Sequence, residues 1–329
     1  MLRYDSLAQL PPLTAPVHLA VGVFDGVHRG HQEVIGGAVR AAAADGGSAV
    51  VLTFSPHPSR LLRPENPVPQ ILDDAGKDRR VAMLGPDCIV HEPFTPELAA
   101  LDAVGFLSVL FRAIPGLSAI HVGRNFRFGH DRAGDVNWLQ ARADARGFRV
   151  FGAANIAAGG APVSSTRIRK LIAEGGIADA NALLGYPYAA SGAVVSGRAL
   201  GRTIGVPTLN LPWAPELLPR FGVYAVRARV VGGDGTDDNG TDGDWFSGVA
   251  NYGLRPTVED VSSGAVRPQL ETHLLAPAGA VGAAGFAAGV GLRVEWLHFL
   301  RPEKKFDGLD ALRVQIAADI ANARAVLAE

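Results

Sequence analysis

The sequence predicts an α/β domain built on a doubly wound parallel sheet, followed by a small antiparallel β-barrel domain with a C-terminal helix. In the first half, continuous apolar runs alternate with helical patterns, which is typical of parallel strands covered on both faces. From Tyr186 onward, short β-type runs separated by Gly and Pro replace the helical periodicity. We therefore expect one domain at residues 1–185 and a second at 186–329.

The first domain is expected to contain five strands, each an apolar run bounded by turn residues. These runs cover 17–24, 49–54, 88–91, 119–122 and 148–151, and helical patterns between them cover 31–45, 74–84, 101–114 and 137–146. A capped helix over 164–174 and a shorter helix ending at Gly185 follow. Ligands of such sheets bind beyond the carboxyl ends of the strands, so we expect the site there.

The second domain is expected to be a barrel of short strands over 190–195, 222–231, 245–250, 269–275 and 291–300. An acidic Gly/Asp run at 232–244 lacks the spacing of a calcium loop and is interpreted as a solvated hairpin tip. An Ala/Gly stretch at 276–289 is interpreted as a connection. In the final helix, 308–327, the apolar residues Leu309, Leu312, Ile316 and Ile320 are predicted to mark the buried face.

Composition limits the classes of partner. A net charge of −1 gives no basic surface, which disfavours binding to nucleic acid or to an anionic membrane. No apolar stretch approaches the length of a membrane span. Cys88 is the single cysteine, which excludes an intramolecular disulfide framework and fits a cytoplasmic protein. We interpret Cys88 as a buried strand residue, and we expect self-association to be weak at most.

The most informative segment is 21–31, V-G-V-F-D-G-V-H-R-G-H, in which a predicted strand turns into a predicted helix. His28 and His31 stand at the helix entrance, where free backbone N–H groups and the helix dipole attract phosphate. The plainer alternative to a phosphate site is that both histidines simply lie on the surface. A metal site is a further alternative, but no third ligand is evident. The glycines that let the backbone approach a ligand closely are Gly22, Gly26 and Gly30.

Other polar segments follow the predicted strands. His57 lies in T-F-S-P-H-P after the second strand, and Asn125 lies in G-R-N-F-R-F-G after the fourth. For the His57 segment, the alternative is a proline-rich turn. For the Asn125 segment, the alternative is that Phe126 and Phe128 simply pack in the core. The segment S-S-T-R-I-R at 164–169 can cap a helix, and its arginines can also bind phosphate. The cations of the 74–84 helix, Lys77, Arg79 and Arg80, are predicted to be surface charges.

The second half carries a comparable pattern. Glycines four residues apart precede Thr208 and Asn210, whose oxygens share one side of an extended segment and can reach one magnesium ion. A simple bend is the alternative for the glycines. Glu271 in E-T-H-L-L is a carboxylate suited to act as a base, although spacing alone favours a solvated strand-edge glutamate. The glycines that could cover phosphates are Gly197, Gly201 and Gly205.

Taken in order, these motifs resemble those of bacterial bifunctional riboflavin kinase/FMN adenylyltransferases. In the first half, the matching motifs are G-x-F-D-G-x-H-x-G-H, N-F-R-F-G, R-A-G-D at 132–135 and S-S-T-x-I-R. In the second half, they are G-x-P-T-x-N, the segments around Tyr224 and Asn251, E-x-H-L-L and the segment from Leu300 to Leu309. The resemblance extends over roughly residues 15 to 327.

The resemblance implies that the first domain transfers an adenylyl group from ATP to FMN. No Walker A or G-x-S-x-G motif is present, so the FMN phosphate would attack ATP directly without a covalent enzyme intermediate. His28, His31 and Arg167 would stabilise the developing charge. The implied ATP- and FMN-binding residues are Gly22, Phe24, Asp25, Gly30, His57, Asn125, Ser164, Ser165, Thr166 and Arg169.

For the second domain, the resemblance implies phosphorylation of riboflavin, with Glu271 as the base for the ribityl hydroxyl and Thr208 and Asn210 holding Mg²⁺ with ATP. No tightly bound organic cofactor is implied. Three positions depart from the family pattern: Leu209 stands in place of alanine, and Ala276-Pro277 stands in place of Asp-Phe. Two alternatives to a bifunctional enzyme remain. One is an adenylyltransferase with a weak or inactive kinase half, and the other is a non-catalytic flavin or nucleotide sensor. The implied ATP- and flavin-binding residues are Gly197, Gly201, Gly205, Thr208, Asn210, Asn251, Arg255 and Arg301.

Overall fold

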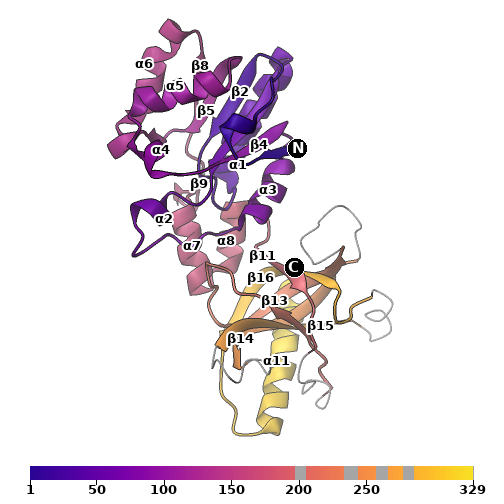
Figure 1. Ribbon diagram of the computed structural model, residues 1–329. Coiled ribbons are helices and arrows are strands. Elements are labelled where there is room, and N and C mark those ends of the chain that lie inside the picture. Colours follow the sequence, from indigo (N-terminus) through magenta and orange to yellow (C-terminus); the bar gives the residue numbers. More distant parts are fainter. Residues whose placement is uncertain (197–204, 233–243, 257–265, 277–284, 329) are drawn as a thin grey trace. The chain divides into compact units, whose positions relative to one another are not determined.

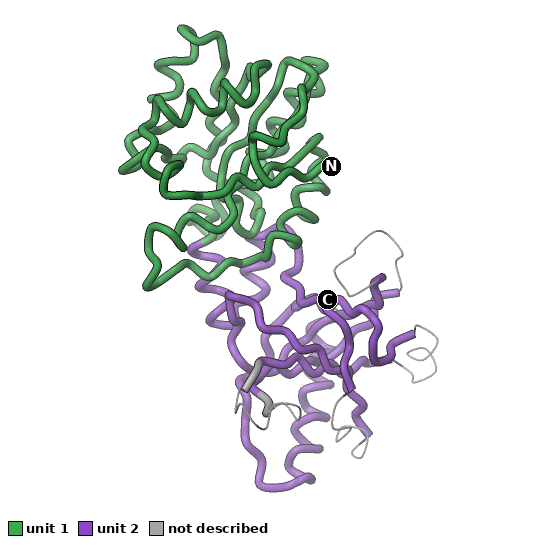
Figure 2. The backbone as a smooth tube through the Cα atoms, viewed as in Figure 1, with its two compact units in different colours: residues 1–165 green, residues 166–329 purple. Residues whose placement is uncertain are grey.

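The computed structural model describes residues 1–196, 205–232, 244–256, 266–276 and 285–328 (Figure 1). The chain forms two compact units, residues 1–165 and 166–329 (Figure 2). The helices predicted between 164 and 185 fall with the second unit, apart from Ser164 and Ser165. Across the described ranges, no helix combines the length and the apolar character needed to cross a membrane.

The first unit contains a six-stranded sheet in the order β1-β4-β3-β2-β5-β8, in which every pair of neighbours is parallel. This arrangement confirms the predicted fold class and all five predicted strands. The edge strand β1 was not predicted, because three mostly exposed residues carry no apolar pattern. The strands are β1 (Leu2–Tyr4), β2 (Val17–Val21), β3 (Ser48–Phe54), β4 (Cys88–Glu92), β5 (Leu117–Gly123) and β8 (Arg149–Ala153).

Helices cover both faces of this sheet, as the continuous apolar strands predict. On one face, α1 (Arg29–Asp45) and α3 (Asp74–Ala82) pack on a cluster that includes Ala20 and Val51. On the other face, α5 (Ala103–Ala113) and α6 (Val136–Arg146) pack on a larger cluster. The short elements are η1 (Leu7–Gln9), α2 (Ser59–Leu62), α4 (Pro96–Ala100), β6 (Arg127–Phe128), η2 (His130–Arg132), β7 (Gly134–Asp135), β9 (Ala157–Ala158) and β10 (Ala161–Pro162).

The direction of the chain across the sheet reverses beside β2. From β2 the chain proceeds to β3 and β4 on one side, and it then returns to β5 and β8 on the other side. Parallel strands end at the same edge of a sheet, so the loops that follow β2, β3 and β5 gather at this reversal, where α/β proteins bind ligands. Cys88 lies in β4 and is buried as predicted, and burial, with a smaller contribution from Asp87, raises the pKa of its thiol to about 11.

The second unit is a nearly closed six-stranded antiparallel barrel, in the order β11-β16-β13-β14-β15-β12. A bridge between Val195 and Asn210 joins its two ends. The architecture confirms the predicted barrel. Its elements are α7 (Ser165–Glu174), α8 (Ile177–Leu184), β11 (Ala189–Ala193), β12 (Leu209–Pro212), β13 (Gly222–Val231), β14 (Phe246–Pro256), β15 (Val266–Leu274), β16 (Gly291–Pro302) and α11 (Leu309–Leu327).

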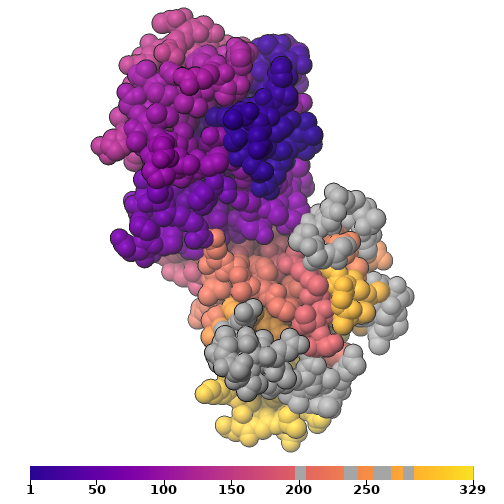
Figure 3. All heavy atoms as spheres, viewed as in Figure 1, coloured from indigo at the N-terminus to yellow at the C-terminus, as the bar shows by residue number. Residues whose placement is uncertain are grey.

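Large aromatic side chains fill the barrel, and Trp296, Tyr224 and Tyr252 are fully buried. Outside the barrel, α11 packs against β13, β14 and β16. Its exposed side forms part of the molecular surface, drawn in yellow in Figure 3. The predicted buried face of this helix was partly wrong, because Leu309 is 55% exposed. The helix instead buries Asp319 and Ala323.

An ion pair accounts for the burial of Asp319. The Arg301 guanidinium donates from Nε and Nη2 to the two carboxylate oxygens of Asp319, at 2.8 and 2.7 Å. Gln315 donates to the same carboxylate at 3.0 Å. A bidentate pair of this kind fixes orientation as well as distance. The helix therefore faces the barrel with a polar anchor as well as with the partly buried Leu312, Ile316 and Ile320.

Candidate active sites

The two predicted histidines lie together at the start of α1. His28 is the N-cap residue, and its Nδ1 accepts a hydrogen bond from the His31 backbone N–H at 3.3 Å. The two imidazole rings are stacked, with centroids 3.6 Å apart and planes 19° from parallel. His28 is buried and His31 is partly buried. The arrangement places two imidazoles and the positive end of a helix dipole at one point, as a phosphate site requires.

The loop between β2 and α1 has a strained backbone. Phe24 and Val27 have φ angles of +50° and +33°, in the region that glycine usually occupies. A Cβ at Gly30 would lie 3.2 Å from the His28 ring, and one at Gly22 would lie 2.9 Å from the Phe24 ring. Such strain persists only where the surroundings enforce it, and it is common at binding sites. Because Gly30 and Gly22 have no Cβ, the rings of His28 and Phe24 can lie close to the backbone of the loop.

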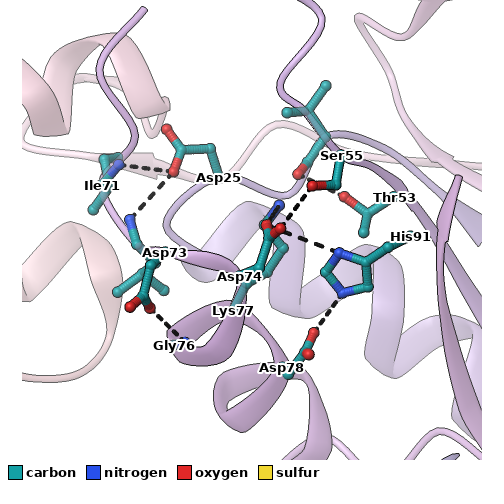
Figure 4. Close-up of polar contacts among 12 residues, drawn as sticks. Asp25, Thr53, Ser55, Ile71, Asp73, Asp74, Gly76, Lys77, Asp78 and His91 are labelled. Atoms are coloured by element: carbon teal, nitrogen blue, oxygen red, sulfur yellow. Dashed lines mark hydrogen bonds and ion pairs between the residues drawn. The ribbon is translucent and has the colours of Figure 1, made fainter. Parts of the chain in front are cut away.

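Asp25 fixes this loop from inside the protein. Its side chain is buried, and Oδ1 accepts hydrogen bonds from the backbone N–H groups of Ile71 at 2.9 Å and Leu72 at 3.4 Å (Figure 4). The Ser165 hydroxyl donates to the Asp25 carbonyl at 2.9 Å. Asp25 was predicted to bind ligand. These contacts give the residue a role in holding the loop that carries the histidines.

The loop after β3 lies beside the histidine loop. The Thr53 hydroxyl donates to the carbonyl of Val23 at 2.9 Å, which joins β3 to the histidine loop. His57 directs Nδ1 to Ser59, whose backbone N–H donates to it at 3.1 Å and whose Oγ lies 2.8 Å away. The imidazole thereby holds the first turn of α2. His57 is partly buried at the sheet edge where the site was predicted.

Asn125 follows β5, in a turn closed by a hydrogen bond from the Phe126 N–H to the Gly123 carbonyl at 2.9 Å. Its side chain is exposed. Phe128, in contrast, lies in the core of the unit, so its role is packing. The motif N-F-R-F-G pairs with R-A-G-D through β6 and β7, and Arg127 forms an ion pair with Asp135 at 3.3 Å. The two motifs therefore form one hairpin.

The motif S-S-T-R-I-R forms the start of α7. Ser164 directly precedes the helix, which begins at Ser165. Thr166, Arg167 and Arg169 lie in its first turns and belong to the second unit. Their roles toward phosphate stay predictions.

In the barrel, the strand register brings together residues that are far apart in the sequence. Glu271 on β15 is directly opposite Asn210 on β12 and Asn251 on β14. Directly opposite residues point to the same face of an antiparallel sheet. Val223 is opposite both Asn251 and Arg301 and extends the row to β16. We call Asn210, Glu271, Asn251, Val223 and Arg301 the transverse row.

The transverse row lies on the outer face of the barrel. Leu270 and Thr272, the chain neighbours of Glu271, are fully buried, whereas Glu271 is only partly buried. Asn210 Oδ1 accepts a hydrogen bond from Gln269 at 3.4 Å, and Asn251 donates to Glu303 at 3.3 Å. The row thus places one carboxylate between two amides. At its end, the guanidinium of Arg301 pairs with Asp319 and its Cζ lies 5.8 Å from the centroid of the Phe306 ring.

The segment that carries Thr208 is tied to the same strand as Glu271. His273 on β15 contacts the carbonyl of Pro207 through Nδ1 at 2.8 Å. Gly205 has a φ angle of +79°, which favours glycine, and Thr208 is half-buried. Gly197 and Gly201 lie outside the described residues. Arg255 is placed opposite Arg267 by its backbone, but its side chain lies outside the described part.

Sequence reasoning missed one group of residues at the first site. Lys77 was predicted to be a surface charge, and this prediction was wrong, because its side chain is fully buried. Its Nζ lies 3.4 Å from Asp74 Oδ1, in a network with Ser55 and His91 (Figure 4). The spacing of Asp74 and Lys77, three residues apart on a helix, indicates a pair. Nothing in that spacing distinguishes a buried pair from an exposed one.

A second buried histidine pair lies in the same sheet, deeper along the strands. His18 Nδ1 lies 3.1 Å from His121 Nε2, and His18 Nε2 lies 3.0 Å from Asp45. Asp45 also pairs with Arg149. Burial, together with the charges of His18 and Arg149, lowers the pKa of His121 to about 4. His121 therefore stays neutral near pH 7. The pair connects β2 to β5, and Asp45 of α1 links it to Arg149 of β8.

Comparison with known proteins supplies an independent line of evidence. A family model described as FAD synthetase matches residues 11–167, and one described as riboflavin kinase matches residues 184–327. The bifunctional riboflavin kinase/FMN adenylyltransferase of Escherichia coli strain K12 is 36% identical over 306 residues, which cover 93% of this chain and 91% of that protein. The protein of the same name from Bacillus subtilis is 32% identical, with coverages of 92% and 89%.

Among solved structures, one described as a macrolide-efflux protein from Streptococcus pneumoniae superimposes with a TM-score of 0.81. It is 28% identical to this chain, and the match covers 98% of each. Its fold is thus shared over nearly the full length. Two family models that together match most of the chain, and relatives above 30% identity along its length, place the chain in the family of bifunctional riboflavin kinase/FMN adenylyltransferases.

Proposed function

We propose that residues 1–185 carry FMN adenylyl transfer and that residues 186–329 carry riboflavin phosphorylation. As a member of this family, the chain phosphorylates riboflavin to FMN and then adenylylates FMN to FAD, with release of pyrophosphate. The match to riboflavin kinase continues to residue 327, beyond the stretch that departs from the family pattern. The main support for assigning these residues to the kinase site is that Glu271 lies between Asn210 and Asn251 on neighbouring strands.

In the kinase reaction, Glu271 is the proposed base. Its carboxylate would accept the proton of the ribityl 5′-hydroxyl while that oxygen attacks the γ-phosphorus of ATP and ADP leaves. Asn251 would orient the hydroxyl or the flavin from the adjacent strand. Arg301 would act mainly by holding α11 next to this face, because its guanidinium is already paired with Asp319. The remaining proposed binding residues are Gly197, Gly201, Gly205 and Arg255.

In the adenylyl transfer, the FMN phosphate would attack the α-phosphorus of ATP, and pyrophosphate would leave. His28 and His31 would donate hydrogen bonds to the phosphate oxygens, together with the N–H groups of α1. Arg167 would stabilise the charge of the departing pyrophosphate. Gly22, Phe24 and Asp25 would shape the loop, and the other proposed binding residues are Gly30, His57, Asn125, Ser164, Ser165, Thr166 and Arg169.

Both reactions use a divalent metal ion with ATP, and we propose that this ion is Mg²⁺. The Thr208 hydroxyl and the Asn210 amide carbonyl are oxygen donors two residues apart, the kind of donor that Mg²⁺ prefers. Asn210 is buried beside the strand that carries Glu271, which fits a metal-bound phosphate next to the base. The ion would neutralise phosphate charge. We also propose a cytoplasmic enzyme without nucleic-acid or membrane partners, with weak self-association at most.

The Asn210→Ala variant tests the placement of the metal. Loss of one oxygen donor should raise the Mg²⁺ concentration that gives half-maximal kinase activity, roughly tenfold, by analogy with the loss of supporting groups at metal sites. Adenylyl transfer, measured on the same preparation, should keep its Mg²⁺ dependence. Asn322→Ala, at an exposed position of α11, is the matched control. An unchanged Mg²⁺ dependence of the kinase would contradict the assignment of Asn210.

A further inference from the structure

A buried polar network lies at the carboxyl ends of β3 and β4, beside the histidine loop. Asp74, in the first turn of α3, accepts a hydrogen bond from the Ser55 hydroxyl at 2.6 Å (Figure 4). Lys77 Nζ contacts the other oxygen of the same carboxylate at 3.4 Å. The network therefore connects a helix, a strand end and the loop that continues from Ser55 to His57.

The charges around Asp74 come from several elements. His91 on β4 directs Nδ1 toward Asp74 at 3.8 Å and Nε2 toward Asp78 at 2.6 Å. Asp78 in turn pairs with Arg3 of β1 at 2.9 Å. Burial would raise the pKa of the Asp74 carboxyl, but the hydrogen bond from Ser55 and the charges of Lys77 and His91 together hold it below its usual value. Asp74 is therefore an ionised acceptor for the Ser55 hydroxyl near pH 7.

Complete burial of Lys77 is the unusual feature of this network. A lysine side chain is almost never fully buried unless it is paired, because the ammonium ion loses its hydration. Lys77 is 0% exposed, and its ammonium donates a hydrogen bond to the Asp74 carboxylate and forms an ion pair with it. A neutral side chain of similar size would fill the same space without that cost. The charge is therefore the property of Lys77 that needs an explanation.

The N-terminal turn of α3 is connected to both loops of the proposed adenylyl-transfer site. The Asp25 carboxylate of the histidine loop accepts from Ile71 and Leu72, just before the helix. Asp73 caps the helix by accepting from the Gly76 N–H at 2.7 Å. Asp74 then reaches the Ser55 loop. A change at Asp74 would therefore move the Ser55 loop relative to the histidines.

We propose that Lys77 is a positioning residue for adenylyl transfer: its buried ammonium holds the Asp74 carboxylate against the Ser55 hydroxyl and so fixes the loop that carries His57. This inference rests on the assignment of adenylyl transfer to the first unit. Lys77 acts through Asp74 and Ser55 and contacts no substrate itself. The effect is geometric, and small displacements of binding groups are costly to a phosphoryl-type reaction that depends on alignment.

The test compares Lys77→Met, Ser55→Ala and the double variant in the full-length enzyme. Lys77→Met should lower kcat/KM for FMN in adenylyl transfer by roughly tenfold to a hundredfold. Ser55→Ala should lower it by a similar factor, and the double variant should fall no further than the worse single variant, because both act through one connection. Riboflavin kinase activity of each variant should equal that of the wild type.

The pH profile separates positioning from general loss of structure. Without the charge of Lys77, burial should raise the pKa of Asp74, so that it becomes protonated as the pH falls. Adenylyl transfer by Lys77→Met should then lose activity on the acid side at a higher pH than the wild type, and recover as the pH rises. Loss of structure alone would lower the rate by the same factor at every pH at which the variant is folded. Arg80→Met, which removes a partly exposed cation from the same helix, is the matched control.

Three results would overturn the inference. They are an unchanged kcat/KM in Lys77→Met, multiplication of the two single effects in the double variant, and an unshifted pH profile. If Lys77→Met does not fold, the adenylyl-transfer rate of Ser55→Ala decides the test. A normal rate in that variant rejects the proposal. Failure of the wild type to convert FMN to FAD would instead reject the assignment of adenylyl transfer, which is a separate outcome.

Discussion

Glu271→Gln is expected to stop riboflavin phosphorylation while leaving the conversion of FMN to FAD intact. The glutamine side chain has nearly the same shape as glutamate, so the strand pairing of β12, β14 and β15 should persist. It cannot accept the proton of the ribityl hydroxyl. A positioned base contributes about 10²–10⁴-fold to such a step, and we expect kcat of the kinase to fall by that factor.

The measurement follows FMN formation from riboflavin and, separately, FAD formation from supplied FMN. Because both activities belong to one chain, the second reaction serves as an internal reference for the amount of enzyme in each preparation. Glu216→Gln, at an exposed position of the same unit, is the matched control and should leave both rates unchanged. A kinase rate within a few-fold of the wild type in Glu271→Gln would rule out Glu271 as the base.

The opposite pattern is expected for His28→Asn. Asparagine can still cap α1, because its side-chain oxygen can accept the N–H hydrogen bond that His28 Nδ1 accepts from His31. The variant therefore removes the imidazole without removing the helix cap. Loss of one preorganised donor to a developing charge costs about 10²–10³ in rate, and we expect adenylyl transfer to fall by that factor. Riboflavin phosphorylation should be unaffected.

FAD formation from FMN, with the kinase rate as the internal reference, measures this effect. His130→Asn is the matched control, since His130 is in the same unit and its side chain is 63% exposed. Equal adenylyl-transfer rates in His28→Asn and the wild type would rule out His28 as a donor to phosphate. A loss of both activities would indicate damage beyond the histidine loop.

The fold and most elements of this protein follow from its sequence because apolar runs report burial directly. The predicted strands of the parallel sheet are present, and so is the change to a barrel. Leu2–Tyr4 could not be predicted, because the strand pairs with β4 mainly through its backbone and is largely exposed. The prediction for α11 was partly wrong, because Leu309, its first residue, is exposed and because the apolar pattern gives no sign of the buried contact of Asp319 with Arg301.

Some features of the two sites could be predicted from the sequence, and others could not. His28 and His31 are close in sequence, so a helix start alone brings them together. The row of Asn210, Glu271 and Asn251 depends on strand register across about 60 residues, which sequence spacing does not determine. Burial of Lys77 depends on how α3 lies on β4, and a charged helix residue gives no sign of it. The proposed roles of Asn210, Glu271 and Asn251 came from the family resemblance, whereas neither the resemblance nor the physical pattern indicated a role for Lys77.

A time course with the wild-type enzyme, riboflavin, ATP and Mg²⁺ tests the central claim most directly. With FMN and FAD resolved by chromatography, FMN should appear first and then decline as FAD accumulates, because the product of one site is the substrate of the other. Supplied FMN should yield FAD without a lag. Formation of FAD from FMN but no product from riboflavin would contradict the claim that one chain performs both reactions.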